Sequence, residues 1–538
     1  MCAPRLALAF LVILASPLAA QHTGHEAGAA KAPGDSVPFY DSLGSFSRKI
    51  STSSTSAQLY FDQGLRLTYG FGHDESVHSF REALRQDPAC AMCAWGVAWA
   101  LGPYINAGRD SAKVAEAWVA IQQAKQLARP RAAVTDVERA LIDAMAVRYE
   151  RVPVEEREAR LDSAYADAMR DVVRSFPHDL DAGTLLGEAL MVLRPWDHWT
   201  RDGRPQPGTE EVLAVLESVL GRNIAHPGAC HLYIHAVEAS TQPERAESCA
   251  ELLGSAIPAA SHVPHMPSHI WMRIGRYGDG VRANQRAWHA DQMAVRGRGV
   301  QIYPTHNLHM LLFAASFDGQ SAVAWQAAKD LARISDASSH YVPLVLARFG
   351  RWQDLLDLSE RPEQEFRRGM WLHARGLALL RTGQPDSAGM YLDSLDALIA
   401  ATPDTLFFRG HPRTDLYAIA RGILAAEIAA STSRWDDAVR ALEAAIPIED
   451  GLDYDEPEPW IMPVRHVLGA VLLEAGRPAD AEAAYRASLL DHRENGWSLI
   501  GLEQALRAQA RTAEADEVRR RFDTAWARAD AWIWASRY

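Results

Sequence analysis

Apolar residues recur at helical spacing, three and four positions apart, along almost the whole chain from residue 57 onward. Breaks rich in Gly, Pro and Asp interrupt this pattern about every 12 to 18 residues, which is the length of an ordinary helix and its turn. The pattern contains no convincing run of the alternation that marks a half-buried strand. The chain is therefore predicted to be all-α.

Helices of this length, joined by short breaks, can belong to a repeat array. Near the start of the helical region, six residues fit positions 4, 8, 20, 24, 27 and 32 of the tetratricopeptide repeat (TPR): Tyr60, Gly64, Ser76, Phe80, Ala83 and Pro88. Near the other end, four residues fit positions 7, 8, 20 and 24: Leu468, Gly469, Ala481 and Tyr485. Small residues at positions 8 and 20 let the two helices of a hairpin approach closely. From about residue 57 to residue 530, the chain thus resembles a TPR-like α-solenoid of antiparallel helix hairpins.

The N-terminus has the pattern of a cleaved secretory signal peptide, with Arg5, an apolar run from Leu6 to Leu14 and small residues up to Ala20. A membrane anchor is the alternative. We expect an exported protein, periplasmic or extracellular, without stable membrane insertion. The predicted organisation is a signal peptide (1–20), a flexible polar tail (21–56), N-terminal repeats with a CxxC motif (57–193), a long loop (194–209), histidine-rich repeats (210–340) and C-terminal repeats (341–538).

Composition narrows the range of partners. The chain of 538 residues is 48% hydrophobic and 23% charged, which is ordinary for a protein with a packed core. Its formal net charge is −13. Because binding to phosphate backbones needs a clustered positive surface, this charge argues against nucleic acid as a partner. A TPR-like groove instead favours a peptide or a protein segment.

Three histidine-rich segments stand out from this generic background: HPGACHLYIHAVEAS (226–240), HVPHMPSHIW (262–271) and THNLHM (305–310). If Ala246, Gly280 and Ala324 occupy position 20 of three successive repeats, the histidines fall at three positions of the first helix of each repeat. They are His231, His265 and His309 at position 5, His235 and His269 at position 9, and His262 and His306 at position 2. The TPR resemblance implies that these positions line the concave groove.

Such a register predicts a transition-metal site. Spacings of three and four residues place side chains on one helical face, and packed helices lie about 8–10 Å apart, so imidazoles from neighbouring helices can share an ion. Neutral imidazole suits Zn, Cu or Fe better than Ca or Mg. Seven imidazoles exceed the needs of one four-coordinate ion, so one or two ions are expected. His262 and His306 are the weaker candidates, because each begins a helix beside a proline.

Glu238, at position 12 of the first of these helices, is the candidate carboxylate. It is placed to bind metal, to orient an imidazole or to act as a general base. The zinc-protease motif HExxH is absent, because Leu232 follows His231. Three functions stay open: a binding protein with a metal site in its groove, a metal-dependent hydrolase or oxidoreductase, and an assembly scaffold whose histidines are structural.

Two long breaks in the array are candidates for lids or binding loops. One is the Trp- and Pro-containing stretch RPWDHWTRDGRPQPGT (194–209). The other is the acidic stretch EDGLDYDEPEPW (449–460). Loops of this length that interrupt a compact array often carry function.

Four cysteines remain after the predicted signal peptide, an even number that permits two disulfides in an exported protein. Cys90 and Cys93 form a CxxC at a helix start, for which a local disulfide is favoured over a redox or metal role. Cys230 and Cys249 fall at positions 4 and 23 of one hairpin, where a bridge would clamp its two helices.

A closer resemblance connects four segments with a group of exported bacterial TPR-containing proteins: HPGACHLYIHAVEAS, HMPSHIWMRIGRYGDG, residues 72–106 and YDEPEPW. In that group a residue such as Asn often precedes HLYIH, whereas this chain has Cys230. The resemblance implies the fold and the export. It assigns no activity.

Overall fold

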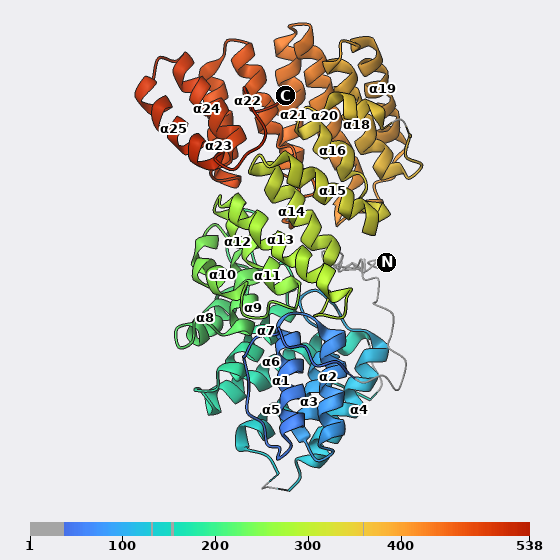
Figure 1. The fold of residues 1–538 in the computed structure, drawn as a ribbon, viewed down its shortest axis with the longest axis vertical. Helices are drawn as coiled ribbons and strands as arrows, with labels where there is room; N and C mark the ends of the chain where they lie inside the picture. Colours follow the sequence, from blue (N-terminus) through green and yellow to red (C-terminus); the bar gives the residue numbers. More distant parts are fainter. Residues whose placement is uncertain (1–36, 131–132, 152–154, 359) are drawn as a thin grey trace, which may run out of the picture.

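The computed structural model describes residues 37–130, 133–151, 155–358 and 360–538. The predicted signal peptide, and the predicted tail up to residue 36, lie outside these ranges. The described chain is a stack of α-helices that runs from one end of an elongated molecule (blue) to the other (red) in Figure 1. The prediction of an all-α fold is confirmed.

The first half consists of consecutive antiparallel helix pairs, each packed against the next. The pairs are α1 (Thr55–Tyr69) with α2 (His73–Gln86), α3 (Ala91–Ala100) with α4 (Ser111–Leu127), α5 (Asp136–Ala146) with α6 (Glu155–Ser175), and α7 (Leu180–Val192) with α8 (Thr209–Leu220). The next two pairs contain the histidine-rich segments: α9 (Pro227–Val237) with η2 (Pro243–Ala246) and α10 (Glu247–Leu253), then α11 (His262–His265) and α12 (Pro267–Arg273) with α13 (Tyr277–Ala294).

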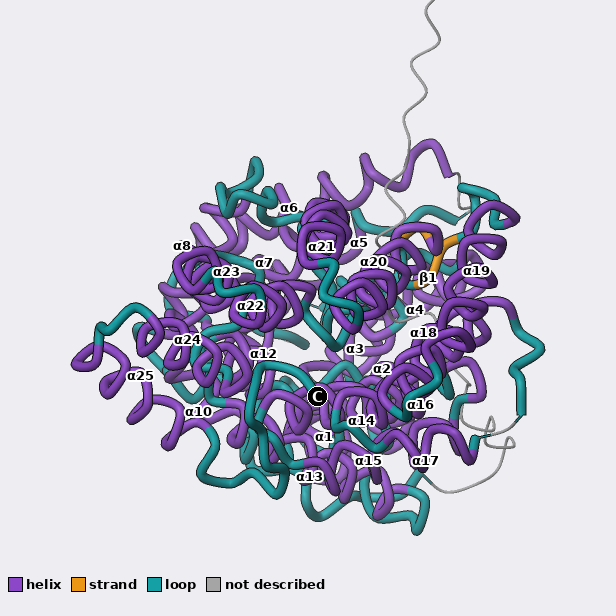
Figure 2. Tube along the Cα trace, turned by 90° about the horizontal axis from the view of Figure 1, so that it is seen from above, coloured by secondary structure: helices purple, strands orange, loops and turns teal. Residues whose placement is uncertain are grey.

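The second half continues the same arrangement. It comprises α14 (Pro304–Phe317) with α15 (Ser321–Ile334), η3 (Asp336–Ser338), α16 (Tyr341–Arg348) with α17 (Trp352–Asp357), α18 (Glu365–Arg381) with α19 (Pro385–Ala401), α20 (Arg413–Ser431) with α21 (Trp435–Glu449), α22 (Val464–Glu474) with α23 (Pro478–Asp491), and α24 (Gly496–Ala508) with α25 (Thr512–Ala525). A short hairpin of two strands, β1 (Phe407–Phe408) and β2 (His411–Pro412), precedes α20 and is orange in Figure 2.

The predicted repeat register is visible in the packing inside the hairpins. A Cβ added at Gly64 would lie 2.7 Å from the ring of Phe80, and one at Gly469 would lie 2.3 Å from the ring of Tyr485. In both hairpins a glycine at position 8 makes room for an aromatic ring at position 24. This close approach is what defines the fold as a TPR-like α-solenoid.

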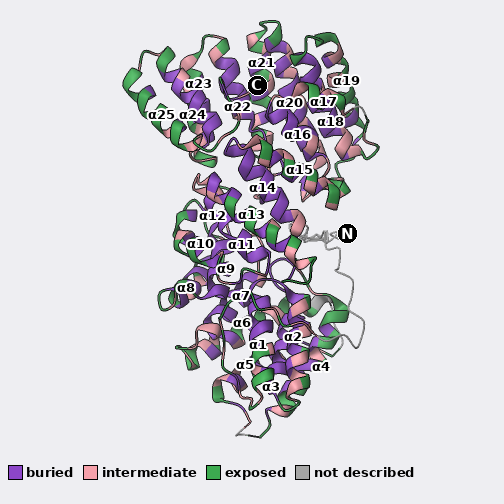
Figure 3. Ribbon diagram, viewed as in Figure 1, coloured by how far each residue is buried: buried purple, intermediate pink, exposed green. Residues whose placement is uncertain are grey.

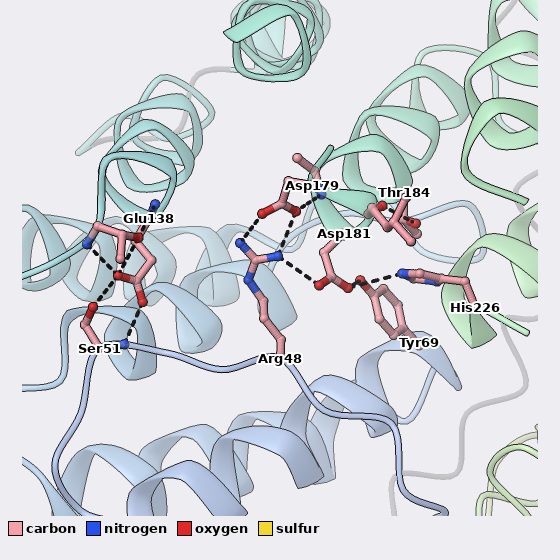
Figure 4. Close-up of polar contacts among 11 residues, drawn as sticks. Arg48, Ser51, Tyr69, Glu138, Asp179, Asp181, Thr184 and His226 are labelled. Atoms are coloured by element: carbon pink, nitrogen blue, oxygen red, sulfur yellow. Dashed lines mark hydrogen bonds and ion pairs between the residues drawn. The ribbon is translucent and has the colours of Figure 1, made fainter. Parts of the chain in front are cut away.

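Residues 37–54 do not form the flexible tail that their composition predicts. Leu43 and Ile50 are buried in the core. Arg48 donates to Asp181 and to a second carboxylate at the start of α7, each at 2.8 Å (Figure 4). These few specific contacts hold the segment against the helices. The composition of the segment, which is low in apolar residues, does not predict them.

The core consists of two large hydrophobic clusters, one built from residues 43–303 and the other from residues 277–533. They meet in the middle of the molecule, at α13 and α14. Figure 3 shows buried residues gathered there, along α9, α11 and α14. No helix among the described residues is long and apolar enough to cross a membrane.

Candidate metal centre

Six of the seven predicted histidines lie together where the two halves of the core meet. They form two groups of three, in each of which one side-chain nitrogen per residue lies within 4.8 Å of the others. The first group is His231, His235 and His262, and the second is His265, His269 and His306. Rings of the two groups are in contact, since the ring centroids of His262 and His265 lie 5.3 Å apart. The six imidazoles therefore form one continuous cluster.

The local sequence explains how each helix presents its histidines. His226 caps α9 by accepting from the Ala229 amide at 3.2 Å, and Pro227 takes the first helical position. His231 and His235 follow on α9 four residues apart, so they share one face of the helix. Further along the chain, α11 supplies His262 and His265, α12 supplies His269, and α14 supplies His306.

In the first group, the hydrogen bonds fix which nitrogen of each ring faces inward. His231 donates from Nδ1 to the main-chain oxygen of Tyr69 at 2.5 Å, and His235 donates from Nδ1 to Oε1 of Glu238 at 2.7 Å. Because both acceptors only accept, each Nδ1 carries the proton and each Nε2 keeps its lone pair. Both Nε2 atoms, and both ring nitrogens of His262, are buried without a hydrogen-bond partner in the described part of the chain. An oriented Nδ1 and an open Nε2 are typical of histidine that binds metal.

Tyr69, which accepts from His231, is itself held in place by a polar network. Its hydroxyl donates to Oδ1 of Asp181 at 2.6 Å, and Asp181 also contacts Arg48 and Nε2 of His226, the latter at 3.3 Å. Figure 4 shows the side chains of Tyr69, Arg48 and His226 converging on the carboxylate of Asp181. The network thereby anchors the end of α1 that orients His231.

The second group places two imidazole nitrogens in direct contact. His265 donates from Nδ1 to Oδ1 of Asn284 at 2.6 Å, and the amide of Asn284 donates to the Gly280 carbonyl at 2.9 Å, which fixes its orientation. His269 donates from Nδ1 to Oε2 of Glu238 at 2.6 Å and also pairs with Glu456. The two Nε2 atoms then face each other at 2.6 Å. Since two lone pairs repel at this distance, one of the two Nε2 atoms must carry a proton, and a metal ion could bind both only if the rings moved apart.

Burial and charge set the protonation of the cluster. Burial, reinforced by the neighbouring imidazoles, holds the pKa of His231 and of His262 well below the usual range, and burial does the same for His265. These rings are neutral at neutral pH, which is the form that binds metal. For His269 burial opposes the charged form, but Glu238 and Glu456 raise its pKa to about 10.

Two carboxylates connect the groups. Side-chain atoms of His235, Glu238, His269 and Glu456 lie within 4.8 Å of one another. Burial alone would raise the pKa of Glu238. The charge on His269 and the hydrogen bond from His235 outweigh burial, so the pKa of Glu238 lies well below its usual range. Burial and the charge on Glu238 instead raise the pKa of Glu456 well above its usual range. The predicted Glu238 thus lies between the two groups, as a hydrogen-bond partner of one imidazole from each.

Glu456 is a site residue that the histidine register does not identify. It lies in the acidic loop between α21 and α22, more than two hundred residues along the chain from Glu238. The same loop supplies Tyr454, whose hydroxyl donates to Oε2 of Glu238 at 3.0 Å. The available signals are the length of the loop and its YDEPEPW segment, and neither singles out one carboxylate.

The cluster lies inside the protein rather than in an open groove, because the exposed fraction of its six histidines is between 0% and 9%. Phe71, from the turn after α1, packs against His231 with ring centroids 4.1 Å apart. Trp196, from the long loop after α7, packs edge-on against His235 at 5.1 Å. Together with Tyr454 and Glu456 of the acidic loop, Trp196 shows that both long loops predicted from the sequence contribute side chains around the cluster.

His309 lies apart from both groups, which corrects its prediction as a ligand. Its ring packs against Tyr341 at 4.3 Å, and its Nδ1 accepts from Nη1 of Arg409 at 2.5 Å. The guanidinium is held there by the buried carboxylate of Asp455. A fixed positive charge in contact with His309 disfavours a metal cation at the same ring.

The four cysteines form two disulfides in the structure, Cys90 with Cys93 and Cys230 with Cys249. The first bond closes the N-terminus of α3. The second joins α9 to α10, with the two Cα atoms 5.1 Å apart. It fastens the helix that carries His231 and His235, and none of these sulfurs is a thiolate that could bind metal.

A cavity adjoins the second group. His269, Tyr454 and Glu456 stand on one side of it, and Arg273 and Met310 stand among its other lining residues. The cavity lies beside the cluster, on the side covered by the acidic loop.

No family model matches the chain, and no curated protein sequence matches it. Solved structures of low identity cover most of it. The crystal structure of the APC/C hetero-tetramer Cut9–Hcn1 is 12% identical, over 87% of this chain and 76% of that chain, with a TM-score of 0.31. The human IFIT1 dimer with m7Gppp-AAAA is 13% identical, over 88% and 90%, with a TM-score of 0.30, and yeast Tom70 is 12% identical, over 88% and 92%, with a TM-score of 0.27. The fold class rests on the packing of the hairpins themselves.

Proposed function

We propose that this TPR-like solenoid binds one or two transition-metal ions in its buried histidine cluster. His231, His235 and His262 hold the first ion, and His265, His269 and His306 hold the second. The observation that carries the proposal is the first group, where three imidazoles each offer a nitrogen within 4.8 Å of the others, Nδ1 of two rings is bonded outward, and Nε2 of both is buried without a partner in the described structure. Buried polar atoms are nearly always satisfied, so this arrangement supports a ligand that the side chains share.

The donor set favours Zn, Cu or Fe. Three neutral imidazoles on one ion leave an open coordination position, which is the arrangement of catalytic rather than closed structural sites. When bound there, such an ion supplies Lewis-acid activation of water or, for Cu and Fe, electron transfer. Glu238 orients His235 and His269, as carboxylates commonly do for metal-binding imidazoles.

A metal-dependent hydrolase or oxidoreductase is the second candidate, and the cavity beside His269 and Glu456 favours it. A metal-binding protein without turnover needs no space for a substrate next to the ion. Here Glu456 and the hydroxyl-bearing ring of Tyr454 stand on the cavity wall. They are positioned to bind a small substrate and to move a proton to or from it.

The experiment is an elemental analysis of protein purified without a histidine tag. Wild type is compared with the double variant His231→Ala, His262→Ala and with the matched control His373→Ala. His373 is equally buried, donates from Nδ1 to the Ala420 carbonyl at 2.8 Å and likewise has a buried Nε2, yet it lies outside both groups.

We expect stoichiometric metal in wild type and in His373→Ala, and at most half of it in the double variant. Wild type that stays free of metal after incubation with Zn, Cu and Fe salts would contradict the proposal. The assembly scaffold with structural histidines would then be the better account.

We also propose that the protein is exported. The two disulfides support this, because such bonds persist mainly in oxidising compartments. Mass spectrometry of the secreted or periplasmic fraction tests it, with a new N-terminus after Ala20 expected. Retention of residues 1–20 in the mature protein would contradict it.

A further inference from the structure

Arg348 is a buried arginine that lacks an ionic partner in the described structure. It ends α16 in the C-terminal half of the molecule, and 5% of it is exposed. The guanidinium stacks on Trp497, 4.0 Å from the ring centroid, and Nη1 donates to Nδ1 of His466 at 3.3 Å. Nε and Nη2 are buried and have no hydrogen-bond partner among the described residues. The cation is thus packed on its face and open along one edge.

The open edge is the one that other arginines of this chain use to hold a carboxylate. Arg170 places Nε and Nη2 on the two oxygens of Glu211 at 2.6 and 2.7 Å. Arg528 binds Asp318 with the same pair of atoms at 2.9 and 2.6 Å. This edge matches the spacing of two carboxylate oxygens, which makes it the strong, bidentate form of the ion pair.

The charges around Arg348 leave a positive excess. Arg381 pairs with Glu427 at 2.7 Å, and Arg537 pairs with Glu427 and with Glu474, each at 3.0 Å, so these two arginines are balanced by two carboxylates and the charge of Arg348 is left over. Burial lowers the pKa of Arg348 to about 9, and the only opposing contribution comes from Tyr538. An ion in such a medium is costly unless a counter-charge accompanies it.

These groups line one pocket. A cavity lies between α16, α18, α20, α22 and the C-terminal residues 536–538. Its charged lining is Arg348, Arg381, Glu427 and Arg537. Its remaining walls are largely apolar and include Trp352, Leu377, Ile423, Met462 and Val467.

We propose that this pocket binds an organic carboxylate with an apolar body. The two carboxylate oxygens bond to Nε and Nη2 of Arg348, and the apolar part lies against the walls formed by α18, α20 and α22. Two sources offer this chemistry, a free carboxylic acid and the C-terminal end of a peptide. The site is independent of the histidine cluster, since it is built from other helices.

Binding is measured by calorimetry with four probes on the full chain: hexanoate, N-acetyl-leucine, N-acetyl-leucinamide and inorganic phosphate. We expect one of the two carboxylates to bind, and the amide to bind about tenfold or more weakly, because it cannot accept both hydrogen bonds as an anion. Tighter binding of N-acetyl-leucine would identify a peptide end, and tighter binding of hexanoate a free acid. Equal binding of the amide, or binding of phosphate alone, would overturn the proposal.

The variant Arg348→Met keeps the length of the side chain and removes its charge. We expect it to lose carboxylate binding and to unfold at a temperature no lower than wild type, because it also removes an uncompensated buried cation. Arg348→Lys keeps the charge without the planar edge, so it should bind about tenfold more weakly and serves if the first variant does not fold. Arg521→Met, whose wild-type edge already holds Glu494, should bind as wild type does. Undiminished binding in Arg348→Met or Arg348→Lys would overturn the proposal.

Discussion

Nε2 of His265 lies 2.6 Å from Nε2 of His269, while Nδ1 of each ring is already bonded to an oxygen acceptor. Without a metal, only a proton on His269 makes this contact attractive, and the carboxylates of Glu238 and Glu456 keep that proton in place. A metal ion that takes the place of the proton would separate the two rings and use both lone pairs. The contact is therefore a point at which proton and metal compete.

Removing metal is expected to destabilise the fold. Because the proposed ions bind only to the folded arrangement of four helices, an ion at a thousandfold excess over its dissociation constant adds about 4 kcal/mol. Calorimetric unfolding before and after dialysis against a chelator measures the difference. The double variant His231→Ala, His262→Ala should show a much smaller one, and equal shifts in both proteins would argue against the cluster as the site.

Neutralising Glu238 should weaken metal binding. The carboxylate orients His235 and His269 through Nδ1, and loss of such a partner costs about tenfold to a hundredfold in affinity. Competition with a chromophoric chelator compares Glu238→Gln with wild type. Glu188→Gln is the control, since Glu188 is buried and accepts from Trp99 but lies outside the cluster. Equal losses in both variants would mean that the effect is not specific to the site.

The Cys230–Cys249 disulfide should support both the fold and the site. The bond closes a loop across a separation of 19 residues, for which the loss of chain entropy corresponds to about 3 kcal/mol. Replacing both cysteines by serine should lower the free energy of unfolding by about this amount and weaken metal binding through α9. The Cys90–Cys93 pair, with a separation of 3, is the control and should have a smaller effect. Unchanged metal affinity after loss of the first bond would contradict its role in holding α9.

Asp181 makes stability depend on pH in the acid range. Burial would raise the pKa of this carboxyl, but the contacts with His226, Arg48 and Tyr69 outweigh burial. The pKa in the folded protein is therefore about 2, against about 3.9 in the unfolded chain. Because the folded pKa is the lower one, the contribution of about 2 kcal/mol is complete above pH 4 and is lost as the pH falls from about 4 to about 2.

Urea unfolding of Asp181→Asn at pH 5 and pH 3 tests this linkage. The variant should be less stable than wild type at pH 5 and closer to it at pH 3. Asp396→Asn, which alters an exposed pair with Arg421, should run parallel to wild type. A gap for Asp181→Asn that stays constant between the two pH values would contradict the depressed pKa.

Much of the cluster follows from local sequence. The spacing of His231 to His235 places this pair on one face of α9, and the same spacing brings His265, at the end of α11, next to His269 on α12. His262 and His306, near helix starts beside prolines, reach the same cluster. Periodicity and repeat register thus predict the fold and the six histidines, together with His309, which does not belong to the cluster.

Contacts that are distant along the chain determine the rest. Arg409, which follows β1, donates to His309 and disfavours a metal ion at that ring. Glu456 contacts His269, whereas the neighbouring Asp455 of the same loop pairs with Arg409. Phe71 packs against His231, at a position that the repeat pattern predicts to line an open groove. Each of these contacts depends on where a loop or turn lies in the folded chain, and helical spacing in the sequence does not predict this.

The most direct test is a crystal structure of the metal-supplemented protein with anomalous difference maps recorded at the absorption edge of the ion found by elemental analysis. The account predicts a peak about 2.0–2.1 Å from Nε2 of both His231 and His235, and also coordinated by His262. A peak between His265, His269 and His306 would accompany it if two ions bind. A map with no peak in the first group, or with peaks only outside these six histidines, would contradict the account.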